Sequence, residues 1–221
     1  MIVTALVVAN VGMNRWVTGW GYVPWAMAWS VVLVAVARRD GRTWADLGLD
    51  RADVRRGLAW GGVLAAIVLV TYLAAMALPA TRDLFRDDRV QGWSLPRTAY
   101  AAFVRVPLGT VLIEEIAFRA VLPAVLMARG SRRTAVAASA LLFGLWHLLP
   151  AIGIGNVNET VSDTVGTLPA WISVVGAVIT TTGVGVWFWW LRDRTGSVLT
   201  PMVLHWSTNG LGYLFAYVAW H

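Results

Sequence analysis

Hydrophobic residues along this chain gather in long runs that short polar segments separate. Most of these runs approach the roughly 20 apolar residues that a helix needs to cross a bilayer. The first run is short, and the fourth is long and contains Pro107 and Pro123, so the fourth is either a broken helix or two pieces. The pattern predicts an all-α, polytopic transmembrane helical bundle of about seven spans, within a range of roughly six to eight. The apolar runs cover residues 1–14, 20–37, 57–79, 99–127, 134–150, 168–191 and 198–220.

The composition agrees with a membrane protein. Hydrophobic residues make up 58% of the chain and charged residues 14%, whereas soluble domains carry about 25% charged residues. The 221 residues leave no room for a separate soluble domain, so we expect residues 1–221 to form a single integral membrane domain. Cysteine is absent, which excludes a disulfide framework, a thiolate nucleophile and a thiolate metal site.

The basic residues indicate how the bundle is oriented. All 18 are arginines, which is typical of a GC-rich, bacterial genome, and most lie in loops, so they predict contact with a bilayer and no nucleic-acid partner. The 38–56, 128–133 and 192–197 loops are rich in arginine, while the 151–167 loop has none. The positive-inside rule therefore places the first three loops and the N-terminus in the cytoplasm, with the chain in the cell membrane. The 80–98 loop agrees least with the positive-inside rule, because this orientation places it on the extracytoplasmic side although it carries four arginines against three aspartates.

Several ionisable residues lie inside the apolar runs. The chain has three glutamates and three histidines, and Glu114, Glu115, His147 and His205 all interrupt hydrophobic sequence. An ionisable group within a membrane costs roughly 2.5–3.5 kcal/mol on insertion scales, so such groups usually face the bundle interior or a wet cavity. These four residues therefore predict a polar site within the membrane.

Helical spacing divides the roles of the two glutamates. Glu115 and Arg119 are four residues apart, share one helix face and can form an ion pair. Glu114 is turned about 100° away from Glu115 and does not share that partner, which leaves it free to act as a general base or acid. For Glu115 and Arg119, a purely structural ion pair remains the alternative.

The two histidines belong to similar pairs. Phe143 and His147 are four residues apart, as are His205 and Asn209. A lone buried histidine is more often structural, but two of them with an asparagine one turn beyond favour a functional site. Placed within their predicted spans, Glu114 and the two histidines differ in depth by roughly 10 Å at ~1.5 Å per residue. The spacing allows a common site without demonstrating one.

The three motifs together resemble a known family. In chain order they read Glu114-Glu115-x-x-x-Arg119, Phe143-x-x-x-His147 and His205-x-x-x-Asn209. They are similar to the signatures of the CPBP (Abi) family, which includes CAAX prenyl proteases and bacteriocin-processing or immunity proteins. The resemblance covers about the C-terminal half of the chain, with a catalytic core at roughly residues 99–220. The segment 44–49, Trp-Ala-Asp-Leu-Gly-Leu, is also similar to family members but much less specific.

The resemblance implies an intramembrane endopeptidase, a CAAX-protease-like hydrolase that the family label calls a metalloprotease. Its cavity would open to the cytoplasmic side, and its substrate would be a membrane-associated protein or peptide. By analogy, Glu114 would activate water with help from His147, while His205 and Asn209 would stabilise the oxyanion. The supporting residues would be Glu115, Arg119 and Phe143, the last packed beside His147.

Other readings of the same residues stay open. Glu114, His147 and His205 match the His₂Glu set of catalytic zinc sites, and a metal-free Glu–His site is equally consistent. A non-catalytic immunity or scaffold protein, or a small proton-coupled transporter, could also bury these groups. The motifs of site-2-type, rhomboid and presenilin-type proteases are absent from the sequence. The sequence names neither the substrate nor the oligomeric state.

Overall fold

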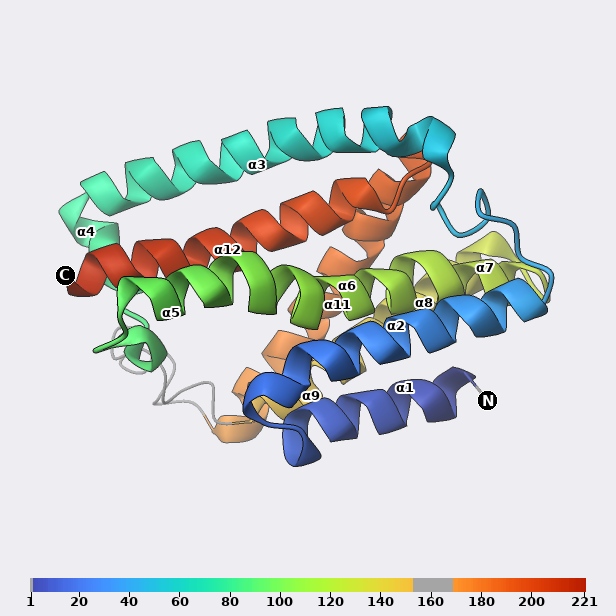
Figure 1. The fold of residues 1–221 in the computed structure, drawn as a ribbon, viewed down its shortest axis with the longest axis horizontal. Coiled ribbons are helices and arrows are strands. Elements are labelled where there is room, and N and C mark those ends of the chain that lie inside the picture. Colours follow the sequence, from blue (N-terminus) through green and yellow to red (C-terminus); the bar gives the residue numbers. More distant parts are fainter. Residues whose placement is uncertain (1, 153–168) are drawn as a thin grey trace.

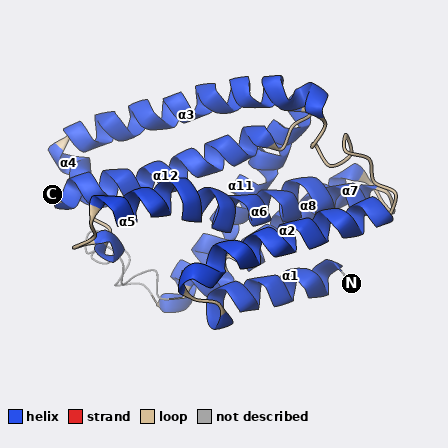
Figure 2. Cartoon of the chain, viewed as in Figure 1, coloured by secondary structure: helices blue, strands red, loops and turns tan. Residues whose placement is uncertain are grey.

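The computed structural model describes residues 2–152 and 169–221, and in these ranges the chain is helical with no strand (Figure 2). The all-α prediction is confirmed. Glu159 and Asp163, which belong to the loop without arginine, lie outside the described residues. Every predicted apolar run corresponds to a helical segment. Six of these are α1 (Ile2–Val11), α2 (Tyr22–Arg39), α3 (Val54–Ala77), α8 (Arg132–Trp146), α11 (Ala170–Thr195) and α12 (Leu199–Trp220), and the short α4 (Pro79–Arg82) and α9 (Leu148–Ala151) follow α3 and α8.

The fourth run forms one continuous helix over residues 95–127 (Figure 1). The expected break at Pro107 does not occur, because this proline lies in a π-helical stretch that closes with i→i+5 hydrogen bonds. The amide of Leu112 donates to the carbonyl of Pro107 in this pattern. The wider turn relieves the clash that a proline makes with an α-helical carbonyl four residues earlier. Its parts are α5 (Leu95–Tyr100), the π stretch η6 (Ala101–Val111), α6 (Leu112–Glu115), the π stretch η7 (Ile116–Val121) and α7 (Leu122–Met127).

Four helical segments of the described chain are long and apolar enough to cross a membrane. They are Gly19–Arg39, Arg51–Ala77, Arg132–Ala151 and Trp171–Thr195. Helix α3 has the surface expected of a helix surrounded by lipid. It buries only Gly57 and Gly61, and it exposes large apolar side chains along its length. An exposed apolar face of this size marks contact with a membrane or a partner. The 95–127 helix and α12 are not among the four.

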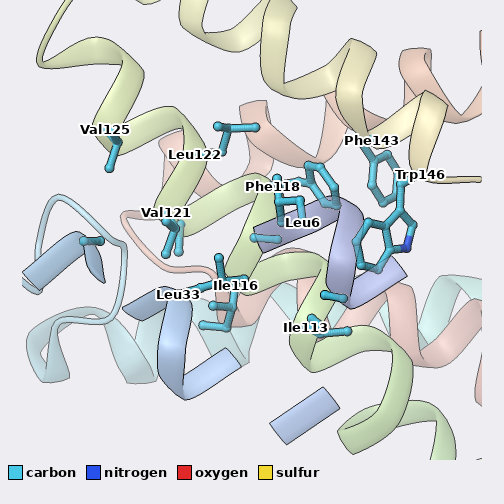
Figure 3. Packing of buried hydrophobic residues seen from close by; sticks show 14 of the residues in the cluster. Leu6, Leu33, Ile113, Ile116, Phe118, Val121, Leu122, Val125, Phe143 and Trp146 are labelled. Carbon is cyan, nitrogen blue, oxygen red and sulfur yellow. The ribbon is translucent and has the colours of Figure 1, made fainter. Parts of the chain in front are cut away.

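The main hydrophobic core lies between α1, α2, α8 and the 95–127 helix (Figure 3). Leu6 and Leu33 pack there against Ile113 and Phe118. In a bilayer such packing stabilises helix association through van der Waals contact, since lipid tails are as apolar as the core. Gly144 lets α8 approach α11, because a Cβ on it would lie 2.6 Å from the carbonyl oxygen of Val178.

Polar contacts tie the three arginine-rich loops together at one end of the bundle. Arg129 donates to Asp40 at 2.6 and 3.1 Å, which joins the end of α2 to the α7–α8 loop. Arg132 pairs with Asp193 at 2.5 Å and so joins the start of α8 to the end of α11. The segment 44–49 lies at the same end, where its Gly48 carbonyl accepts from the amide of Val198 at 2.9 Å. This segment is therefore remote from Glu114, His147 and His205 and supports the α11–α12 turn.

A second set of contacts defines the opposite end of the bundle. The C-terminal Trp220 donates from its indole to the carbonyl of Asp87 at 3.0 Å. The ring of Trp93 stacks on that of Tyr213, with the ring centroids 5.7 Å apart. The α1–α2 connection reaches this end as well, since the ring of Trp20 lies 5.6 Å from that of Tyr100 at the end of α5. Figure 1 shows the C-terminus and α4 at this end and the N-terminus at the other.

Candidate active site

Glu114 lies in α6, the short α-helical piece between the two π stretches. Its side chain is buried, and its Oε1 accepts a hydrogen bond from the indole N–H of Trp146 at 3.1 Å. Its Oε2 has no hydrogen-bond partner among the described residues. This oxygen faces the Nε2 atoms of His147 and His205 at 3.7 and 3.8 Å. One carboxylate oxygen is therefore held in place while the other remains available between two imidazoles.

His147 stands at the C-terminal end of α8, where the helix turns into α9. Its Nδ1 lies 2.8 Å from the carbonyl oxygen of Phe143. A carbonyl only accepts, so Nδ1 carries the proton, and in the neutral ring Nε2 keeps a lone pair. The Phe143 ring contacts the imidazole edge-on at 4.6 Å, as the shared face predicted. His147 thus presents a hydrogen-bond acceptor toward Glu114.

His205 is oriented by the second glutamate. Its Nδ1 donates to Glu115 Oε1 at 2.8 Å, and both side chains are buried. The neutral ring of His205 therefore also presents a lone pair at Nε2, on the side of Glu114. From the sequence, only the ion pair with Arg119 was expected for Glu115. The structure shows that Glu115 joins Arg119 to His205 across two helices.

Arg119 balances the charge of Glu115. Its Nε lies 3.2 Å from Glu115 Oε2, so the predicted i,i+4 ion pair forms, although the atoms are not aligned as a hydrogen bond. The guanidinium lies over the ring of Phe143 at 3.8 Å and over that of Phe188 at 5.2 Å. Aromatic faces stabilise a desolvated cation, which explains how a side chain only 1% exposed keeps its charge.

Asn209 lies one turn beyond His205 on α12 and lines the same cavity as Glu114. Its amide oxygen accepts a long hydrogen bond from Thr208 Oγ1 at 3.4 Å. Among the described residues no group binds its amide N–H₂. Asn209 is exposed to the cavity, and within the described chain its side chain has no hydrogen bond to Glu114, His147 or His205.

The cavity itself has a volume of about 1120 Å³. Glu114, His147 and His205 lie at its inner end, in the middle of the bundle. It continues past Arg105 and Arg89 toward the end of the bundle where the C-terminus lies. Arg89 is paired with Asp87, and this hydrogen bond raises the pKa of the guanidinium further above its usual range, so it stays cationic.

Two residues of the site, Trp146 and Phe188, were not predicted from the sequence. Trp146 holds Glu114, and its position directly before His147 was a signal that could have pointed to it. Phe188 lies on α11 among other aromatic residues, and nothing in its sequence context distinguishes it. The roughly 10 Å difference in depth also disappears in the structure. Because α8 ends at Trp146, His147 sits at a helix terminus in the middle of the bundle, level with Glu114.

A metal site was one of the expected alternatives for Glu114, His147 and His205. In the part of the chain that the structure describes, no group of three or more histidine, aspartate or glutamate side chains is arranged to hold a metal ion. The arrangement can hold a water molecule that donates its two hydrogens to Glu114 Oε2 and His147 Nε2. A carboxylate in this position can serve as a general base.

Comparison with known proteins identifies the family of the chain. The model of a protein family described as type II CAAX prenyl endopeptidase Rce1-like matches residues 96–211. This is just over half of the chain and includes every motif residue from Glu114 to Asn209. No curated protein and no solved structure matches the chain significantly. The chain therefore belongs to the Rce1-like family of type II CAAX prenyl endopeptidases, helical membrane proteins of the CAAX protease type.

Proposed function

We propose that this chain is an intramembrane endopeptidase that hydrolyses a membrane-associated protein or peptide, with Glu114 as the base that activates water. One observation carries the proposal. Glu114 Oε2 is buried without a protein partner, faces two imidazole nitrogens at 3.7 and 3.8 Å, and lies at the inner end of a large cavity. A buried acceptor without a partner costs about 1–3 kcal/mol, and a substrate water removes that cost.

In the proposed reaction, Glu114 Oε2 takes a proton from a water molecule while the water oxygen attacks the carbonyl carbon of the peptide bond. His147 Nε2 accepts the second hydrogen of that water and so orients its lone pair. The indole of Trp146 keeps the carboxylate from rotating. The proton held by Glu114 then passes to the leaving nitrogen as the carbon–nitrogen bond breaks. General acid–base catalysis of this kind contributes about 10²–10⁴ to the rate.

The oxyanion of the tetrahedral intermediate would be stabilised by Asn209 and His205. The amide N–H₂ of Asn209 is a neutral donor that faces the cavity and needs no change of protonation. In the resting site His205 is neutral and its Nε2 is an acceptor, because Nδ1 donates to Glu115. To donate from Nε2 to the oxyanion, His205 would first take a proton from bulk water through the cavity. Glu115 Oε1, 2.8 Å from Nδ1, would stabilise the resulting imidazolium. One donor to an oxyanion is worth about 10²–10³ in kcat.

A small proton-coupled transporter is the alternative function for the same buried groups. Transport needs a path that can open to both sides of the membrane. Among the described residues, the cavity lining runs from the middle of the bundle to one end and includes no residue of the three arginine-rich loops. A transporter in one state of alternating access would show the same one-sided cavity. Substrate flux in proteoliposomes without peptide cleavage would therefore identify a transporter.

The experiment that tests the proposal compares cleavage of a membrane-peptide library by the purified wild-type protein, Glu114→Ala and His147→Ala. The third histidine, His221, lies at the C-terminus and stacks on Tyr217, so His221→Ala is a matched control. We expect both site variants to lose cleavage and the control to keep it. Undiminished cleavage by both site variants would remove the assigned site and favour a non-catalytic role. Metal analysis of the same preparations tests the zinc alternative.

A further inference from the structure

The active-site cavity extends toward only one of the two ends of the bundle. Beyond the catalytic cluster it is lined by the α1–α2 connection, the segment after α4 and the last turns of α12. Thr18 and Arg89 on its rim are exposed, so the cavity reaches the molecular surface there. Within the described chain, its lining includes no residue from 38–56, 128–133 or 192–197.

The arginines lie mainly at the other end. Eleven of the chain's 18 arginines belong to the three arginine-rich loops: six to 38–56, three to 128–133 and two to 192–197. The ion pairs Asp40–Arg129 and Arg132–Asp193 join these loops, as do the hydrogen bonds from Arg192 to the carbonyls of residues 45 and 46. Six arginines lie at or near the cavity end, where aspartates accompany them, and Arg119 is in the core. The positive-inside rule counts arginines in short loops near the span ends, so it assigns the first end to the cytoplasm.

We infer that the catalytic cavity opens to the side of the membrane away from the cytoplasm, and that the site takes extracytoplasmic stretches of membrane-anchored or exported polypeptides. The inference rests on the proposed function and names its substrate class. It departs from the cytoplasmic opening that the family resemblance implies. A cytoplasmic opening would require the bundle to insert with eleven loop arginines outside, against the rule.

The dimensions and charges of the cavity suit such a substrate. Its volume of about 1120 Å³ is above the roughly 300–1,000 Å³ of small-molecule pockets, so it has room for a segment of extended peptide. Arg105 lines it between the rim and Glu114, with its guanidinium over the ring of Tyr22 at 4.6 Å. In the described residues Arg105 is in no ion pair, so it can bind a backbone carbonyl or a carboxylate of a polypeptide that enters from the rim.

The absence of cysteine makes the inference directly testable, because any introduced cysteine is unique. Thr18→Cys reports on the cavity rim, and Ala45→Cys reports on the arginine-rich end, where Ala45 is exposed. Neither substitution changes the charge balance that sets the orientation. Both variants are expressed in a bacterial host, and spheroplasts are treated with a membrane-impermeant maleimide before and after permeabilisation.

We expect Thr18→Cys to be labelled in intact spheroplasts and Ala45→Cys to be labelled only after permeabilisation. The inference is overturned if Thr18→Cys reacts only after permeabilisation, or if the two positions react alike. This readout needs no proteolysis, so it decides the side of the cavity even if the proposed protease function fails. For the active protein, right-side-out vesicles should cleave an impermeant peptide added outside, and inside-out vesicles should not.

Discussion

Replacing Arg119 by methionine should destabilise this protein more than removing any arginine on its surface. Arg119 and Glu115 are 1% and 0% exposed, so the substitution leaves a buried carboxylate without its cation. Breaking a buried pair from one side costs about 3–5 kcal/mol. The hydrogen bond from His205 to Glu115 remains and offsets part of this loss, while the cation–π contact with Phe143 is lost as well. We expect a decrease of about 3 kcal/mol in the free energy of unfolding.

The assay is unfolding of the purified protein in mixed micelles by titration with SDS, followed through the fluorescence of its 14 tryptophans. Glu115→Gln combined with Arg119→Met removes both charges and should recover at least half of the lost stability. Arg132→Met breaks an exposed pair with Asp193 and should change the stability by less than about 1 kcal/mol. If Arg119→Met costs no more than Arg132→Met, the reasoning about the buried pair is wrong.

Further predictions concern other contacts of the same chain. Trp146→Phe removes the indole donor to Glu114 while keeping an aromatic ring, so kcat in the peptide-cleavage assay should fall by about tenfold or more. Asn209→Ala removes the neutral oxyanion donor, and steady-state kinetics should show kcat reduced by about 10²–10³ with KM little changed. At the arginine-rich end, the hydrogen bond from Arg129 lowers the pKa of Asp40. The stabilisation from this carboxylate is therefore present at neutral pH and is lost as the pH falls through the lowered pKa. Asp40→Asn should accordingly lower the Tm at pH 7 but leave it unchanged in acid strong enough to protonate the carboxyl, as thermal unfolding at both pH values can show.

Contacts within one helix were predictable because helix geometry alone determines them. The four-residue spacing predicted that Glu115 meets Arg119 and that Phe143 meets His147, and the structure shows both contacts. The apolar runs predicted the helices for the same reason, since a bilayer admits few other structures. Side-chain contacts within a single helix can therefore be predicted from the sequence.

Contacts between helices were not predictable, because they depend on where each helix ends and how deep it sits. The pairs Glu115–His205 and Glu114–Trp146 both join separate helices. The first joins the 95–127 helix to α12, and the second forms where α8 ends, at Trp146. The continuity of the 95–127 helix was also missed, because a π-helical stretch that accommodates Pro107 leaves no recognisable pattern in the sequence.

The central claim is that Glu114 activates the water that cleaves the peptide bond. The most direct test is the single-turnover rate of peptide cleavage by purified Glu114→Gln, which keeps the shape of the side chain and an oxygen that can accept from Trp146 but cannot take a proton. If Glu114 is the base, the rate should be about 10²–10⁴ lower than that of the wild type. A rate within about tenfold of the wild type would show that Glu114 is not the base.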